Sequence, residues 1–428
     1  MRIAIQTIGC KVNQSESAFI EGALIGCGHE IVDYNDSPDL CIVNTCTVTS
    51  KADYQSRQLI RRAIRNGAKV IATGCYAQLR ADEVLGIEGV ISVIGNYEKE
   101  KIISNINRLF DHKERLMDVS PSNGIFFSEA YHSKRARAFL KIQDGCNRSC
   151  SYCIIPLARG KNRSMSPHDV LKAVQGLYSL GYQEIVLTGI HIGSYGIDLE
   201  PKSSLVEIIK DIKSHYPTPR IRLSSIEPDE VNDEVLSLMN DNLICPHLHI
   251  PIQSGSDRIL SSMNRGYTRD YIRRLINKIV SINPDVSIGT DIIVGFPGEG
   301  DEEFKLTYQL LEELPFSYIH VFPYSKRKGT VAVSLPYHVS HEIKRQRVES
   351  INGLAREKRI SYISRYKDKV LDVIIEGRDS NTGYYKGISS NYIRVLVKDN
   401  GLKPYARTLV RGISFNNNAL ICEPEMSL

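Results

Sequence analysis

The sequence lacks the features that mark membrane-spanning and secreted proteins. No apolar run approaches the roughly 20 residues that a bilayer-spanning helix needs. The first residues do not combine a charged leader with an apolar centre and a small-residue cleavage site. The sequence also has no long internal repeat and no low-complexity segment. We therefore expect a protein of the reducing cytoplasm that does not associate with membranes.

Length and composition indicate a folded protein of several domains. At 428 residues, the chain is longer than one hydrophobic core usually supports, so we expect two or three domains. Hydrophobic residues make up 42% and charged residues 24% of the chain, as in ordinary globular proteins. Residues 341–369 carry nine Lys or Arg against four acids, which equals the net charge of +5 of the whole chain. This pattern predicts a basic helix, which fits either RNA phosphates or a solvated surface.

The N-terminal segment, residues 1–125, alternates strand-like runs with helical patterns, which predicts an open parallel α/β sheet. Each of three buried-strand patterns leads directly into a cysteine. The strands are 2–8, 39–43 and 69–73, and the cysteines are Cys10, Cys46 and Cys75. Because parallel strands end at one edge of their sheet, we expect these three thiols to converge there.

The rest of the chain predicts two further domains of different class. A segment rich in Ser, Pro and Gly, 118–138, is typical of a linker. Residues 132–365 then predict a partial (β/α)6 barrel, with its active site at the carboxyl ends of the strands. The six strand-like runs are 139–143, 184–188, 220–224, 247–250, 287–294 and 318–322. Residues 366–428 alternate apolar and polar positions and predict a small all-β barrel.

The densest chemical motif follows the first strand of the expected barrel. Cys146, Cys150 and Cys153 form a C-x3-C-x2-C run on one short loop. Three such thiolates can hold a 4Fe-4S cluster and leave one iron open to another ligand. Zinc is the main alternative, but a structural zinc site needs four ligands and no suitable His or Cys follows nearby.

This cysteine motif at this place resembles that of the radical S-adenosylmethionine (SAM) enzymes. The resemblance implies that the open iron is chelated by S-adenosylmethionine, which one electron cleaves to a 5′-deoxyadenosyl radical. It also implies cofactor contacts at five positions beyond the cysteines. These are Tyr152, Gly189, Glu227, Gln253 and Gly295.

The chain also resembles the methylthiotransferases almost from end to end. Matching stretches include 7–14, 44–48, 73–78, 188–196, 251–256, 291–299 and 324–330, and residues 387–392 resemble the RNA-binding TRAM module. The resemblance implies a second 4Fe-4S cluster on Cys10, Cys46 and Cys75. It further implies sulfur insertion at an unactivated C–H bond and methylation of that sulfur, with two S-adenosylmethionine molecules consumed per turnover.

Within this family, the segments 9–14, 191–196 and 222–228 are most similar to the enzymes that modify N6-threonylcarbamoyladenosine (t6A). The implied reaction gives 2-methylthio-N6-threonylcarbamoyladenosine next to the anticodon, at tRNA position 37. The alternatives are isopentenyladenosine in tRNA, an aspartate of a ribosomal protein, or a non-enzymatic iron–sulfur RNA-binding protein. The implied partners are tRNA, a sulfur donor and an electron donor such as flavodoxin or ferredoxin.

Several further residues have less specific signals. Four residues near expected strand ends are suited to a modified nucleotide or its carboxylate, or to plain surface solvation: Arg159, Arg163, Tyr324 and Arg327. Four cysteines share no pattern and are typical of buried thiols without a role: Cys27, Cys41, Cys245 and Cys422. His247 and His249 are interpreted as ordinary barrel residues, since no third metal ligand lies at suitable spacing.

Overall fold

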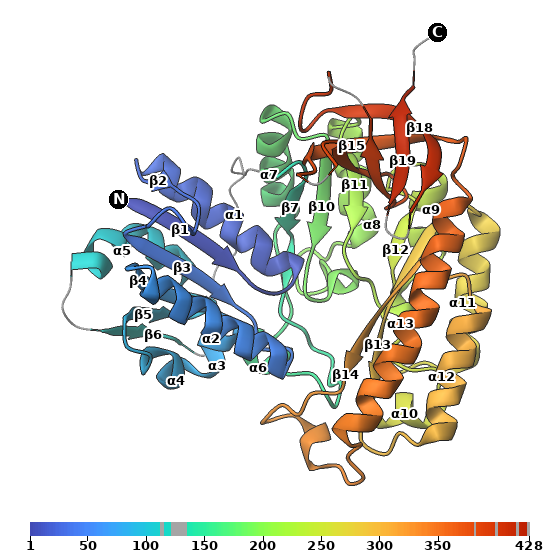
Figure 1. Ribbon diagram of the computed structural model, residues 1–428, viewed down its shortest axis with the longest axis horizontal. Coiled ribbons are helices and arrows are strands. Elements are labelled where there is room, and N and C mark those ends of the chain that lie inside the picture. The colour runs from blue at the N-terminus through green and yellow to red at the C-terminus, as the bar shows by residue number, and fades with distance from the viewer. Residues whose placement is uncertain (112–114, 121–134, 381, 399–400, 417–418, 426–428) are drawn as a thin grey trace.

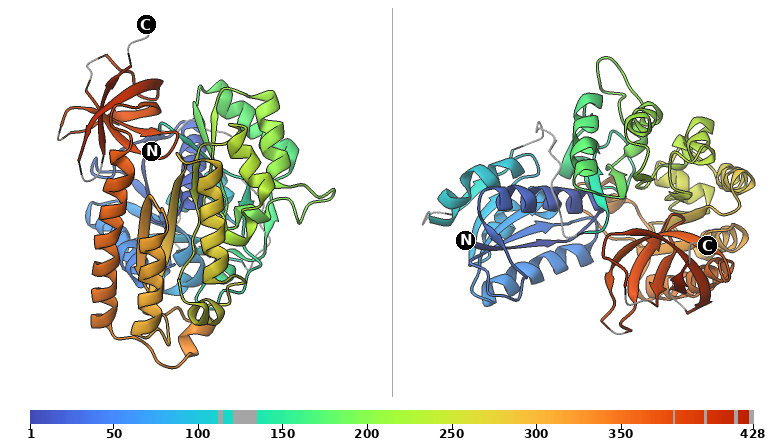
Figure 2. Two further views of the ribbon diagram at one scale, coloured as in Figure 1. Left: turned by 90° about the vertical axis from the view of Figure 1, so that its right-hand side faces the viewer. Right: turned by 90° about the horizontal axis from the view of Figure 1, so that it is seen from above.

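The computed structural model in Figures 1 and 2 describes residues 1–111, 115–120, 135–380, 382–398, 401–416 and 419–425. Most of the expected linker, 118–138, lies outside the described residues. Three β-structures lie along the chain: an N-terminal parallel sheet, a central pair of parallel sheets and a C-terminal closed barrel. Among the described residues, no helix is long and apolar enough to cross a membrane.

The N-terminal part is an open sheet of six parallel strands in the order β2-β1-β3-β4-β5-β6. The strands are β1 (Arg2–Thr7), β2 (Glu30–Ile31), β3 (Leu40–Thr45), β4 (Lys69–Gly74), β5 (Val90–Ile94) and β6 (Leu116–Asp118). The helices are α1 (Lys11–Gly26), α2 (Ser50–Arg65), α3 (Cys75–Leu79), α4 (Ala81–Leu85) and α5 (Lys99–Asp111). The three predicted strands and the parallel α/β class are confirmed.

Alternation along β3 explains why this sheet is covered on both faces. Cys41 and Val43 join the cluster that contains Ile60 of α2, whereas Leu40 and Ile42 join the cluster that contains Ile20 of α1. Successive side chains of a strand point to opposite faces, so a fully apolar strand needs helices on both sides.

Cys41, Cys245 and Cys422 are buried, as expected, but Cys27 is exposed where α1 ends, so the expectation for Cys27 is wrong.

The central part contains all six predicted strands, arranged as two three-stranded parallel sheets, β11-β10-β7 and β12-β13-β14. A parallel bridge between Ser225 and His249 connects them. The strands are β7 (Ala138–Lys141), β10 (Glu184–Thr188), β11 (Arg220–Leu223), β12 (His247–His249), β13 (Ser287–Val294) and β14 (Tyr318–Pro323). The short strands β8 (Gln143–Asp144) and β9 (Arg163–Ser164) pair antiparallel beside them.

Helices cover these sheets with apolar stripes at helical spacing. They are α6 (Ile155–Arg159), α7 (Pro167–Ser179), α8 (Leu205–His215), α9 (Asp233–Asn240), α10 (Asp257–Ser262), α11 (Arg269–Ile282), α12 (Asp301–Glu313) and α13 (His341–Ser364). In α11, for example, Ile272, Ile276 and Ile279 are fully buried in the central core. The Thr268 hydroxyl accepts a hydrogen bond from the Tyr271 backbone N–H and so caps this helix.

The C-terminal part is a closed five-stranded barrel in the order β15-β16-β17-β19-β18, which confirms the predicted small all-β barrel. Its strands are β15 (Val370–Arg378), β16 (Tyr385–Ser389), β17 (Arg394–Val397), β18 (Arg407–Phe415) and β19 (Leu420–Pro424). Along β15, Leu371, Val373 and Ile375 alternate into the barrel core. Closure leaves no long unpaired strand edge among the described strands of this barrel.

The C-terminal barrel lies at the amino ends of the central strands (Figure 1). A buried ionic network fixes it there. Arg220 and Arg222 both bind the carboxylate of Glu184. They also donate hydrogen bonds to backbone carbonyls of the barrel, Arg220 to Asp372 at 2.8 Å and Arg222 to Ser390 at 2.9 Å. The barrel therefore covers the end of the central sheets opposite to the carboxyl ends of their strands.

This network predicts an acid-dependent stability. Burial alone would raise the pKa of Glu184, but Arg222 and Arg220 outweigh burial and hold this pKa well below its usual range. A lowered pKa stabilises the fold fully above the unfolded value of about 4.3 and progressively less as the pH falls below it. We expect Glu184→Gln to cost roughly 3 kcal/mol at pH 7. The difference in unfolding free energy between this variant and the wild type, measured by thermal unfolding, should decrease as the pH falls from about 5 to about 3.

The matched control for this measurement is Glu376→Gln. Glu376 binds Arg137 at 2.9 Å from a more exposed position, so its loss should cost little at any pH. If the difference in unfolding free energy between Glu184→Gln and the wild type stays constant over this pH range, the account is contradicted.

Candidate active site

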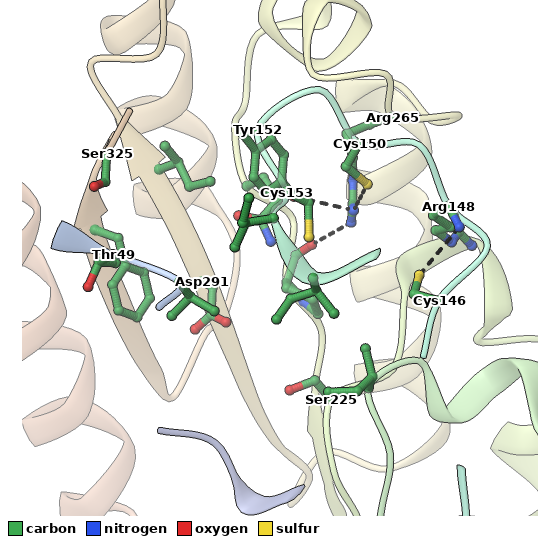
Figure 3. Close-up of a pocket in the computed structure, with 18 of the residues that line it drawn as sticks. Thr49, Cys146, Arg148, Cys150, Tyr152, Cys153, Ser225, Arg265, Asp291 and Ser325 are labelled. Carbon is green, nitrogen blue, oxygen red and sulfur yellow. Dashed lines mark hydrogen bonds between the residues drawn. The ribbon is translucent and has the colours of Figure 1, made fainter. Parts of the chain in front are cut away.

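A cavity of about 360 Å³ lies at the carboxyl ends of the central strands (Figure 3). Its walls come from the cysteine loop, from the ends of the central strands and from Val48 and Thr49 of the N-terminal part. The residues that line it include Cys146, Arg148, Cys150, Tyr152, Cys153, His191, Ser225, Glu227, Gln253, Arg265, Asp291 and Tyr324. Both parts of the chain thus contribute to one cavity, at the edge where ligands of parallel sheets usually bind.

The cysteine loop is shaped by a glycine and by backbone hydrogen bonds. Gly145 has a φ of +69°, and a Cβ there would lie 1.9 Å from the Lys161 carbonyl oxygen, so no larger residue fits. The Cys146 N–H donates to the Gly160 carbonyl at 3.1 Å, and the Cys153 N–H donates to the Cys150 carbonyl at 3.0 Å. The motif therefore folds into a compact loop whose three thiols line the cavity.

The donor set of this loop fits a 4Fe-4S cluster. The Arg148 backbone N–H lies 3.4 Å from Cys146 Sγ, and Arg265 Nη1 lies 3.3 Å from Cys150 Sγ, so both can stabilise thiolates. Burial raises the pKa of Cys153 to about 12, so metal binding must displace its proton. His191, a further imidazole in the described lining, directs Nε2 toward Glu230. Three protein ligands with one open position suit this cluster better than structural zinc.

Three of the five predicted cofactor residues line the cavity. Tyr152, Glu227 and Gln253 do so directly. Gly189 and Gly295 instead lie where the backbone passes close to other groups. A Cβ on Gly189 would be 2.6 Å from Gln143 Oε1, and a Cβ on Gly295, at a φ of +69°, would be 2.4 Å from Lys344 Cγ.

The three N-terminal cysteines converge as the strand ends predict. Cys10 lies at the start of α1 just after β1, Cys46 follows β3 and Cys75 begins α3 directly after β4. A Cβ on the adjacent Gly9 would lie 3.1 Å from Cys46 Sγ. Burial raises the pKa of Cys46 to about 12, and the neighbouring thiols of Cys75 and Cys10 add to this shift. Three thiols separated by 36 and 29 residues in sequence thus share one site.

Comparison with known proteins identifies the family. The radical SAM superfamily matches residues 140–311, and an uncharacterized protein family, UPF0004, matches residues 2–95. Threonylcarbamoyladenosine tRNA methylthiotransferase MtaB of Bacillus subtilis is 39% identical over 410 residues, which cover 92% of this chain and 90% of that protein. The chain belongs to the radical SAM tRNA methylthiotransferases.

Other relatives bear the same kind of name. The MtaB enzyme of Thermotoga maritima is 38% identical over 92% of this methylthiotransferase and 90% of its own length. A tRNA-2-methylthio-N(6)-dimethylallyladenosine synthase of Clostridium tetani is 32% identical over 88% of this chain and 86% of its own. Radical SAM enzymes use a 4Fe-4S cluster and S-adenosylmethionine, and methylthiotransferases carry a second cluster, which confirms the predicted cofactors.

Solved structures share the fold at low sequence identity. The radical S-adenosylmethionine methyltransferase TsrM from Kitasatospora setae, solved with cobalamin and a 4Fe-4S cluster, has a TM-score of 0.57 and 16% identity. The alignment covers 78% of this methylthiotransferase and 77% of that chain. This likeness supports the radical-SAM-like arrangement of the parallel sheets.

Two of the predicted substrate residues have other partners in the methylthiotransferase. Arg159, at the end of α6, is fully buried, and its Nε lies 3.2 Å from Cys75 Sγ. Arg327 is 8% exposed and donates to the Thr47 carbonyl at 3.1 Å and to Asp53 at 2.5 Å. Both arginines join the central part to the N-terminal sheet, so plain surface solvation does not describe them, and their contact with substrate stays a prediction.

The other two predicted substrate residues differ in burial, since Tyr324 is buried and Arg163 is partly exposed. Tyr324 lines the cavity, and its hydroxyl is buried without a hydrogen-bond partner among the described residues. Arg163 is half-buried and lies over the Tyr97 ring at 4.6 Å from its centre. Contact of Tyr324 and Arg163 with substrate stays a prediction.

Arg265 and Arg148 are site residues that motif spacing did not reveal. Arg265 forms an ion pair with Glu227 and lies 3.5 Å from the Tyr152 hydroxyl. Arg148 pairs with Asp229 through Nη2 at 2.8 Å, and its Nε lies 3.0 Å from His191 Nε2. Arg265 lies 115 residues after Cys150, so only the three-dimensional fold shows that the two are in contact.

His249 lies near two groups of metal-ligand type that its sequence neighbourhood does not contain. His249 Nε2 and His320 Nδ1 each lie 3.1 Å from Asp291 Oδ1, and these three groups are close enough together to hold a metal ion. The other nitrogen of His249 lies 2.7 Å from the Ser225 hydroxyl. Hydrogen bonds alone therefore satisfy His249, and His247 pairs separately with the Tyr318 hydroxyl at 2.8 Å.

The turn between β4 and Cys75 gives a test of how the N-terminal thiols are positioned. Gly74 has a φ of +94°, and a Cβ there would lie 2.3 Å from the Thr45 carbonyl oxygen. Gly67 has a φ of +86°, and a Cβ there would meet no atom within 4 Å, so it is a matched control for backbone strain alone. We expect Gly67→Ala to lower the free energy of unfolding, measured in urea, by about 1 kcal/mol. Gly74→Ala should lower it clearly more. Equal unfolding midpoints for the two variants would contradict this interpretation.

Proposed function

We propose that this methylthiotransferase converts threonylcarbamoyladenosine in tRNA, next to the anticodon, into its 2-methylthio derivative. The observation that carries the proposal is the shared cavity. Cys146, Cys150 and Cys153 line it from one side, and Val48 and Thr49, which follow Cys46 closely, line it from the other. Radical formation and sulfur transfer can thus act on one bound base.

The choice of nucleoside is supported by the pattern among relatives. Four MtaB enzymes are 35–39% identical to the chain, whereas four dimethylallyladenosine synthases are 30–33% identical. Coverage is similar in both groups, so the difference reflects the sequences themselves. This difference favours threonylcarbamoyladenosine over isopentenyladenosine.

The site geometry supports the proposed catalytic roles. Cys146, Cys150 and Cys153 would hold a cluster that, with S-adenosylmethionine bound, would supply the radical that removes hydrogen from the substrate carbon. Tyr152 and Glu227 would orient the cofactor, and Arg265 pairs with the carboxylate of Glu227 and lies near the Tyr152 hydroxyl. Cys10, Cys46 and Cys75 would hold the second cluster, which would supply the sulfur atom for insertion.

We divide the chain into residues 1–125, which hold the auxiliary cluster, residues 132–365, a partial (β/α)6 radical SAM barrel, and residues 366–428, a TRAM module that binds RNA.

The basic helix α13 contributes less to RNA binding than its composition suggests. Arg347 binds Glu299 and Asp301, and Lys344 donates to the Tyr324 carbonyl, so these charges stabilise the fold. The exposed cations of this segment are Arg345, Arg356, Arg365, Lys367 and Lys369.

The reaction requires partners beyond tRNA. An electron donor such as flavodoxin or ferredoxin would reduce the cluster in the cavity, and a sulfur donor would restore sulfur to the auxiliary site after each turnover. S-adenosylmethionine would be consumed twice per turnover, once for the methyl group and once for the radical.

Mass spectrometry of tRNA nucleosides tests the substrate. In cells that lack the gene, threonylcarbamoyladenosine should accumulate and its methylthio derivative should disappear, and a plasmid copy should restore the derivative. If the methylthio derivative of isopentenyladenosine disappears instead, the proposed substrate is wrong. Loss of a methylthio group from a ribosomal-protein aspartate, measured by mass spectrometry of the ribosomal proteins, would likewise contradict it.

A single cysteine variant separates the two proposed cluster sites. We expect Cys10→Ala to retain 5′-deoxyadenosine formation with reduced protein and S-adenosylmethionine but to give no methylthio product. Cys27→Ala is the matched control, because Cys27 is an exposed cysteine at the other end of the same helix. Loss of 5′-deoxyadenosine formation in a folded Cys10→Ala protein would contradict the division of roles.

A further inference from the structure

Five charged side chains are buried together where the N-terminal sheet meets the central sheets. Glu16 of α1 and Lys99 of α5 come from one side, and Lys141 of β7, Asp144 of β8 and Arg159 of α6 come from the other. Each is at most 6% exposed. Lys141 Nζ lies 2.9 Å from Glu16 Oε1 and 3.1 Å from Asp144 Oδ2, and Lys99 pairs with Glu16. The interface is therefore ionic and closed to solvent.

Arg159 connects this network to a cysteine of the auxiliary site. Its Nη1 donates to Glu16 at 2.8 Å and to Asp144 at 3.1 Å, and its Nη2 donates to Asn13 Oδ1 at 2.6 Å. Its remaining side-chain N–H, on Nε, lies 3.2 Å from Cys75 Sγ. Arg159 is thus held by the carboxylates with one donor aimed at a sulfur atom.

The five residues of the network carry three positive and two negative charges. The described ion pairs join Lys99, Lys141 and Arg159 to the carboxylates of Glu16 and Asp144. Arg163, 3.7 Å from Asp144 at the more exposed edge, adds further positive charge. An uncompensated buried charge is costly. A doubly positive 4Fe-4S core with three thiolates carries one negative charge, which would balance the buried excess.

The position of Arg159 in the chain also links the two cysteine sites. The five-residue helix α6 starts two residues after Cys153 and ends at Arg159. The same short helix therefore follows the last cysteine of one site and contacts Cys75 of the other. Asn96 donates to the Ala158 carbonyl at 2.9 Å and holds the end of this helix against the N-terminal part.

We propose that the buried network of Glu16, Lys99, Lys141, Asp144 and Arg159 balances the negative charge of the auxiliary cluster. Within this network, Arg159 is a positioning residue: its Nε–H donates a hydrogen bond to Cys75 Sγ and so raises the reduction potential of the cluster. The inference rests on the proposed ligand set of Cys10, Cys46 and Cys75. Hydrogen bonds to ligand sulfur and nearby positive charge favour the more negative, reduced state of a cluster.

The test uses the full chain with Cys146, Cys150 and Cys153 all replaced by Ala, so that the auxiliary cluster is the one observed. After anaerobic reconstitution, its reduction potential is measured by EPR-monitored titration. Arg159→Gln should shift the potential to a more negative value, and Arg159→Lys should shift it less because the charge is kept. Arg163→Gln is the matched control, since it removes a nearby cation that does not touch Cys75. It should shift the reduction potential least.

A variant that removes a negative charge separates an electrostatic effect on the reduction potential from a structural disturbance of the interface. Glu16→Gln removes a negative charge, so we expect a shift to a more positive potential, whereas a merely structural role would move both variants in one direction. An unchanged potential in Arg159→Gln, or shifts of the same sign in both, overturns the proposal. If Arg159→Gln does not fold, the sign of the Glu16→Gln shift decides alone. If no cluster forms with Arg159 intact, the ligand assignment fails instead.

Discussion

The structure depends on one property of parallel sheets, namely that all their strands end at the same edge. In the N-terminal sheet this property gathers Cys10, Cys46 and Cys75, which local motifs would not join. In the central sheets it places the cysteine loop, Glu227 and Gln253 around one cavity. Because Val48 and Thr49 of the N-terminal part also line that cavity, both parts of the chain contribute to its walls.

Buried ionic contacts join the three parts of the chain to one another. Arg159 and Arg327 join the N-terminal sheet to the central sheets, and Arg220 and Arg222 join the C-terminal barrel to them. Buried ion pairs add little net stability compared with apolar contacts, but breaking one partner is costly. Such contacts therefore favour a defined geometry between the parts, which a reaction with two separated cysteine sites requires.

Much of this arrangement could be predicted from local sequence patterns. The apolar runs that end in Cys10, Cys46 and Cys75 specify both the strands and the edge where the thiols meet. The spacing of Cys146, Cys150 and Cys153 specifies a metal loop without any tertiary information. Alternation along residues 370–375 is enough to predict a β-barrel strand, since period-2 patterns report directly on side-chain direction.

The rest depended on contacts between distant segments. Arg159 and Arg327 look like ordinary loop cations in sequence, and only tertiary packing buries them against carboxylates 143 and 274 residues away. The same reason applies to Arg265, Asp291 and His320, whose partners lie on other strands or loops. For Cys27 the pattern carried no information on burial, because a helix end is exposed or covered according to its neighbours.

The central claim is that two separate three-cysteine sites in one chain each hold a 4Fe-4S cluster. The most direct measurement is the iron and sulfide content, with Mössbauer spectra, of the anaerobically reconstituted full-length protein and of two triple Cys→Ala variants, one for each cysteine set. The account predicts about eight irons per chain in the wild type and about four in each triple variant. About four irons in the wild type, with no loss when Cys10, Cys46 and Cys75 are replaced, would contradict it.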